Sequence, residues 1–169
     1  MSAILPAVSI VVAILATAVP WGLPSEATFV LPLIVVMMVF GWRAIDGAHL
    51  PPIAAMLLGL LTDVTTGGPL GFWALIALMA SSAGKRTPPF IDRWGYGVLW
   101  LLWIPLVSAL AGFGWLLASL YFFRWVDWHP IALGAAVSVV LFPAVLYLLL
   151  TIKRVSVPAR RSVAYGGRA

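Results

Sequence analysis

The chain has 169 residues, of which 63% are hydrophobic and 9% are charged, and its mean hydropathy is +1.10. This composition leaves too little polar material to cover a water-facing surface, so it excludes an ordinary soluble globular domain. The absence of cysteine excludes disulfides, thiol catalysis and thiolate metal sites. The net charge of +5 is compatible with several kinds of partner, and its placement along the chain decides between them.

Six apolar runs are separated by breaks that contain proline, glycine or charged residues. They predict an all-α fold, a polytopic transmembrane helical bundle in a single domain over residues 1–152. At roughly 20 residues per span, the chain has room for about six spans and for no separate soluble domain. The expected spans are approximately 4–22, 28–42, 52–66, 70–83, 96–123 and 131–152, followed by a basic tail over 153–169.

The first run is similar to the apolar part of a signal peptide. No Lys or Arg precedes it, so the basic region of a signal peptide is missing and we expect an uncleaved first span. The third and fourth runs are short, and the turn Gly67-Gly68-Pro69 joins them. These two runs either cross the membrane fully or form a re-entrant hairpin. The fourth run stops at Gly84, and the fifth starts at about Tyr96.

The basic residues are distributed unevenly across the expected membrane. With six spans and both ends on one side, that side receives nine of the ten Lys and Arg residues, and the other side receives Arg124 alone. The nine are Arg43, Lys85, Arg86, Arg93, Lys153, Arg154, Arg160, Arg161 and Arg168. By the positive-inside rule, both termini are predicted to be cytoplasmic.

The tail carries five basic residues and no acidic ones. Each basic residue close to an anionic leaflet contributes about 1 kcal/mol to membrane binding, so Lys153, Arg154, Arg160 and Arg161 are expected to lie against anionic lipid headgroups. A cytoplasmic protein partner is the alternative. Nucleic acid is not expected as a partner, because the membrane topology already accounts for this charge.

The third run contains a carboxylate, Asp63, in an apolar setting. Ala55, Gly59, Asp63 and Gly67 recur every four residues, so a helix places them on one face. An acid at the centre of a spanning helix costs roughly 2.5–3.5 kcal/mol, which requires a local reason. Either the carboxylate accepts hydrogen bonds from free N–H groups of the turn around Thr65–Gly68, or it has a partner-facing or relay role, with this small-residue face against a second protein.

Groups that could carry catalysis are missing from the sequence. No nucleophile elbow, phosphate-binding loop or dinucleotide-binding fingerprint is present, and Asp63 is the only carboxylate in the expected spans. His49 and His129 fall on opposite sides of the membrane in this topology, so they cannot share a metal ion. We therefore expect no enzyme activity, no catalytic residues, no metal and no cofactor.

The pattern G-L-L-x-D followed by G-x-P-L-G, within residues 57–75, resembles the rod shape-determining protein MreD family. The residues at the characteristic positions are Gly59, Asp63, Gly67, Pro69, Leu70 and Gly71. This resemblance implies a non-enzymatic scaffold in the bacterial inner membrane that supports peptidoglycan synthesis and cell shape. It implies binding to MreC, to the glycosyltransferase RodA and to a penicillin-binding transpeptidase, with an indirect link to MreB.

MreD is also similar in architecture to the substrate-binding subunits of energy-coupling-factor transporters. A small-solute-binding membrane subunit is therefore the alternative function. An enclosed pocket lined by Trp73, Trp100 or Asp63 would favour transport, whereas an open, lipid-facing cleft beside the third span would favour the scaffold.

Overall fold

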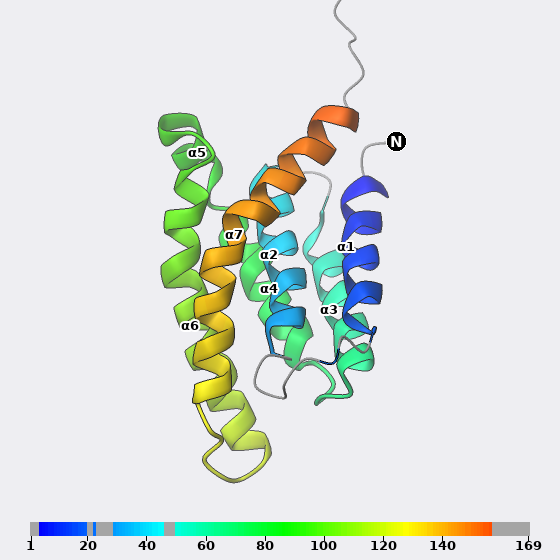
Figure 1. The fold of residues 1–169 in the computed structure, drawn as a ribbon, viewed down its shortest axis with the longest axis vertical. Helices are drawn as coiled ribbons and strands as arrows, with labels where there is room; N and C mark the ends of the chain where they lie inside the picture. Colours follow the sequence, from blue (N-terminus) through cyan, green and yellow to red (C-terminus); the bar gives the residue numbers. More distant parts are fainter. Residues whose placement is uncertain (1–3, 20–21, 23–28, 46–49, 157–169) are drawn as a thin grey trace, which may run out of the picture.

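The computed structural model describes residues 4–19, 22, 29–45 and 50–156. These residues form seven helices and no strand, which confirms the all-α prediction. The helices are α1 (Ile4–Thr17), α2 (Val30–Ile45), α3 (Pro52–Thr66), α4 (Phe72–Gly84), α5 (Pro88–Trp94), α6 (Val98–Tyr121) and α7 (His129–Ser156). Apart from the short α5, they run up and down the bundle in alternation, so that α1 starts and α7 ends at the same end (Figure 1).

Helices α2 and α4 occupy the middle of the bundle. Helix α2 packs against α4 and α7, α3 packs against α4 and α1, and α6 packs against α7 and α4. Every residue of α2 from Val35 to Ala44 is buried, which places the most apolar part of this helix inside. The α6–α7 pair therefore covers one side of the centre, and α1 and α3 cover the other (Figure 1).

Three aromatic rings join α2, α6 and α7 in the core. The rings of Trp103 and Phe142 stack with centroids 5.1 Å apart and an angle of 9° between their planes. Phe40 lies against both rings, at 5.5 Å and 5.9 Å. The indole N–H of Trp103 donates to the Ser138 hydroxyl at 3.3 Å, so its polar atom is satisfied inside the bundle.

A second tryptophan compensates for a proline in α7. Pro143 has no N–H, so the carbonyl of Val139, four residues earlier, lacks its usual helical donor. The indole N–H of Trp100 on α6 donates to this carbonyl at 2.9 Å. The hydrogen bond satisfies the free carbonyl and ties α6 to α7 at the same point.

Two of these helices are long and apolar enough to cross a membrane, namely Val98–Tyr121 and the segment His129–Arg154 of α7. Only 22% of the residues in the most apolar part of each helix are buried, so most of their side chains are at least partly exposed. This suggests association with a membrane. Helices α1 to α4 have 13 to 16 residues, fewer than the roughly 20 needed for a span, so six crossings remain a prediction.

The boundaries differ most from the expected ones at three places. Helix α1 ends at Thr17, before the expected end of the first span at residue 22. Residues 88–94 form the short helix α5, because prolines fit the first turn of a helix, where the N–H groups have no partners. Helix α7 continues to Ser156, so Lys153 and Arg154 belong to a helix and not to a separate tail.

Replacement of Phe142 should destabilise the bundle strongly. Phe142→Ala removes one ring of the buried stack and leaves a cavity, so the free energy of unfolding should fall by about 3–5 kcal/mol. Denaturation in mixed detergent micelles measures this change. Phe90→Ala, on the exposed surface of α5, is the control and should change stability little. Equal losses for the two variants would contradict the assigned core.

Candidate functional site

Helix α3 ends and α4 begins at glycines in left-handed conformations. Gly67, directly after α3, has a φ of 67°, and its N–H donates to the carbonyl of Asp63 at 3.1 Å. Gly71, directly before α4, has a φ of 95°. Residues with a Cβ rarely adopt these angles, so both positions favour glycine. The two glycines reverse the chain within five residues and form what we call the α3–α4 hairpin, residues 52–84.

The Asp63 carboxylate caps the N-terminus of α4. Its Oδ1 accepts the N–H of Trp73 at 2.7 Å, and its Oδ2 accepts the N–H groups of Gly71 at 2.8 Å and Ala74 at 3.4 Å. The first N–H groups of a helix have no partners within the helix, and negative charge is favourable at this end. Asp63 is only 1% exposed, and these three donors compensate for its removal from water.

Gly59 lies one turn before Asp63 and allows α4 to approach. A Cβ at this position would lie 2.4 Å from the Ala74 Cα and 2.8 Å from both the Ala74 nitrogen and the Trp73 carbonyl oxygen. These are backbone atoms of α4, which cannot move aside as a flexible side chain would. Glycine is therefore required for the backbone contact that brings the first turn of α4 within reach of the carboxylate.

The structure thus assigns an internal role to the small-residue face. The expected hydrogen bonds to Asp63 are present, but their donors belong to the start of α4 and not to the turn around Thr65–Gly68. The expectation that Gly59 and Asp63 face a second protein needs correction, because α4 covers them. Ala55 is buried in a cluster with residues of α1 and α2.

The remaining residues of the sequence pattern lie nearer the surface. Gly67 is exposed, and Pro69 and Gly71 are partly buried. Leu70 is 77% exposed. The opposite face of α3 is also apolar and exposed along its length. We call it the outer stripe of α3, and it consists of Ile53, Leu57, Leu61 and Val64.

At the other end of the bundle, two basic side chains bind backbone carbonyls. The ammonium group of Lys153 donates to the carbonyl of Ile45, the last residue of α2, at 3.1 Å. The guanidinium of Arg43 donates to the carbonyl of Leu50 at 2.8 Å. Lys153 therefore stabilises the C-terminus of α2, and its contact with lipid or a partner stays a prediction. Arg154 is exposed, and Arg160 and Arg161 lie outside the described residues.

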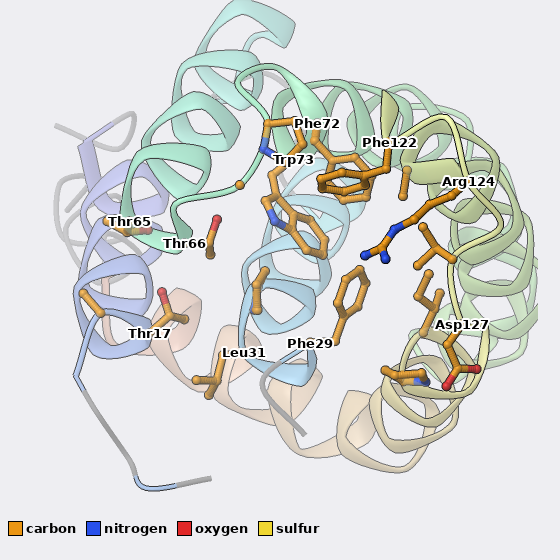
Figure 2. A pocket seen from close by; sticks show the side chains of 18 of the residues that line it. Thr17, Phe29, Leu31, Thr65, Thr66, Phe72, Trp73, Phe122, Arg124 and Asp127 are labelled. Atoms are coloured by element: carbon orange, nitrogen blue, oxygen red, sulfur yellow. The ribbon is translucent and has the colours of Figure 1, made fainter. Parts of the chain in front are cut away.

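A cavity of about 900 Å³ lies beside the hairpin and opens to the surface (Figure 2). It forms where α1 and α3 end, where α2 and α4 begin, and where the chain passes from α6 to α7. We call it the end cavity. Trp73 contributes to its wall, but Asp63 and Trp100 do not, so only one of the three side chains named from the sequence lines this cavity. Its volume lies within the range of small-molecule sites.

One basic and one acidic side chain lie at the end cavity. Asp127 accepts hydrogen bonds from the ring Nδ1 of His129 at 2.7 Å and from its backbone N–H at 3.1 Å, and these bonds lower the pKa of Asp127. The guanidinium of Arg124 lies 5.9 Å from the ring centroid of Phe122. In the sequence, Arg124 is notable only for its place in the expected topology. Within the described ranges, no group of three His, Asp or Glu residues could hold a metal ion.

No protein-family model, no curated protein and no solved structure matches this chain.

Loss of the carboxylate should weaken the hairpin. In Asp63→Asn, an amide nitrogen replaces one acceptor oxygen and faces N–H donors, so the free energy of unfolding should fall by about 1–3 kcal/mol. Unfolding in mixed micelles measures the loss. Asp92→Asn on the exposed surface of α5 is the matched control, and an equal effect in both variants would refute the capping role.

A side chain at Gly59 should force the hairpin apart. Gly59→Ala places a methyl group against the backbone of α4, which should lower the free energy of unfolding by about 1–3 kcal/mol. Gly112→Ala is the control, because nothing lies within 4 Å of the added methyl group. Alanine favours helix over glycine, so Gly112→Ala should be neutral or stabilising by up to about 1 kcal/mol. Stabilisation by Gly59→Ala would contradict the backbone contact.

Proposed function

We propose that this chain is a multi-pass protein of the bacterial inner membrane, in which α1 to α4, α6 and α7 cross or enter the bilayer. Its ends are then both cytoplasmic. The distribution of charge supports this orientation. The ends of α2, α4 and α7 and the short α5 lie at one end of the bundle and carry the basic residues, while the α6–α7 connection with Arg124 lies at the other (Figure 1).

In this membrane, the protein serves as a non-enzymatic scaffold of the cell-elongation complex. The observation that carries the proposal is that the residues of the MreD-like pattern build one structural unit. Gly59 admits the backbone of α4, Asp63 caps it, and Gly67 and Gly71 turn the chain between the two helices. The resemblance therefore concerns the geometry of the α3–α4 hairpin and not a chemical reaction.

The outer stripe of α3 is the surface that we assign to MreC. Since α4 covers the Gly59/Asp63 face, a partner must contact the hairpin from outside. The outer stripe and Leu70 together present apolar side chains along the whole length of the hairpin. Helices associate within a bilayer chiefly through packing contacts of this kind. RodA, the transpeptidase and, indirectly, MreB would join through the same complex.

The end cavity supports a second candidate function, a small-solute-binding subunit of an energy-coupling-factor-type transporter. Its volume of about 900 Å³ suits a small molecule, and Trp73 offers an aromatic wall. Its open side and the absence of Asp63 and Trp100 from its lining favour the scaffold. Stabilisation of the purified protein by a water-soluble vitamin-sized compound would support the transport function.

Copurification with MreC tests the scaffold and its docking surface together. Wild-type protein should retain MreC in mild detergent, and Leu57→Trp should reduce the retained amount about fivefold or more by disturbing the packed stripe. Leu116→Trp on α6 is the matched control, because Leu57 and Leu116 are both 57% exposed. It should retain MreC normally.

Two outcomes would contradict these proposals separately. If the wild-type chain does not retain MreC, the scaffold function is wrong. If MreC is retained equally by wild type and by both tryptophan variants, the scaffold stands but the outer stripe of α3 is not its docking surface.

A further inference from the structure

We infer that the end cavity binds an anionic membrane lipid, with the lipid phosphate at Arg124 and the adjoining apolar part against the aromatic wall. This inference rests on the membrane placement proposed above but not on the scaffold function. It concerns a ligand site at the end of the bundle opposite to the basic helix ends, where Arg124 is the only cation in the expected topology.

Arg124 is the positively charged donor of the end cavity, and it favours an anion. Thr17 and Thr66 line the cavity, but their hydroxyl protons are donated to carbonyls of their own helices, at 2.6 Å to Ile14 and 2.9 Å to Thr62. A hydroxyl has one proton, so these groups offer a ligand only acceptor lone pairs. Arg124 carries five N–H donors in a fork that fits phosphate oxygens.

Arg124 is also placed to use these donors. Figure 2 shows its side chain extending into the cavity, whereas Asp127 lies at the margin. Asp127 is engaged by His129 through two hydrogen bonds, and Arg124 forms no ion pair with it or with the other described residues. The charge of the guanidinium is therefore available to a ligand.

The aromatic side chains that line the end cavity favour a ligand with an apolar part. Phe29, Phe72, Trp73 and Phe122 line the cavity, and the ring of Trp73 lies 5.2 Å from that of Phe29 and 5.1 Å from that of Phe72. A small inorganic anion would leave this aromatic surface uncovered in a volume of about 900 Å³. An amphipathic anion fills both parts of the site.

The surroundings of the cavity favour a lipid as the source of this anion. Large apolar side chains project from the end of α6 and the connection beyond it, including Leu120, Tyr121, Phe123 and Trp125. Tryptophan, tyrosine and arginine at the end of a membrane-crossing helix mark the level of the lipid headgroups. The cavity therefore opens where lipid phosphates are concentrated.

Lipid binding to the purified full chain tests the inference. Thermal stability in detergent is titrated with phosphatidylglycerol, with zwitterionic phosphatidylcholine, and with glycerol 3-phosphate as the headgroup fragment. Phosphatidylglycerol should stabilise the wild type at lower concentration than the other two compounds. Arg124→Gln should weaken the response to phosphatidylglycerol about fivefold, as expected for the loss of one basic contact with an anionic lipid.

Two matched controls distinguish the site from general charge or packing effects. Arg93→Gln should respond as wild type does, because Arg93 also lies 5.9 Å from an aromatic ring, that of Trp94, but does not line the cavity. Ala118→Trp places an indole in the cavity wall and should abolish the response, whereas Ala109→Trp on the exposed surface of α6 should not.

Each contrary outcome overturns a defined part of the inference. Equal responses of wild type and Arg124→Gln, or of the two lipids, would show that no anionic lipid binds at Arg124. Tight binding of glycerol 3-phosphate would identify a water-soluble ligand and favour the transport function. Retention of MreC by the same preparations is measured in parallel, so failure of the lipid site and failure of the scaffold are separate results.

Discussion

The hydrogen bonds between the Asp63 carboxylate and the start of α4 hold the hairpin together. A carboxylate at 1% exposure would be strongly destabilising without partners, and so would free N–H groups at a buried helix start. Each group satisfies the other, so neither can be removed without leaving a buried polar atom unpaired. Gly59 makes this contact possible, since the absence of a side chain there lets the backbone of α4 approach one turn away from the carboxylate.

The position of α4 in turn determines the contacts at its start, beside the end cavity, and at its end, beside α2. At its start, Trp73 packs against Phe29 and forms part of the wall of the end cavity. At its end, Gly84 lies against α2, where a Cβ would be 2.8 Å from the carbonyl oxygen of Phe40. Close backbone contacts thus fix α4 at two points along its length, and the cavity wall is held by the rigid part of the bundle.

The helices were predictable from sequence because proline, glycine and charge interrupt the apolar runs clearly; α3 spans residues 52–66 in both prediction and structure. Helix α5 was missed because a seven-residue helix is too short to show periodicity, and Pro88-Pro89 also suits a loop. In the sequence, the small residues beside Gly59 and Asp63 predicted that the backbone of another helix packs closely against this face of α3. Sequence spacing does not say whether that backbone belongs to the same chain or to another, and only the structure identifies α4.

The basic side chains at the two ends of the bundle have different partners. Those at one end donate hydrogen bonds within the fold, whereas the side chain of Arg124 at the other end donates none to the described residues. Lys153 and Arg43 donate to carbonyls near the end of α2, so part of the basic charge at that end is used within the fold. At the opposite end, the contact of Arg124 among the described residues is with the ring of Phe122, which supplies no hydrogen-bond acceptor. A guanidinium beside an aromatic cavity keeps its donors for groups outside the chain. Basic residues at the first end therefore stabilise the fold, while Arg124, the basic residue that lines the end cavity, is suited to hold a ligand.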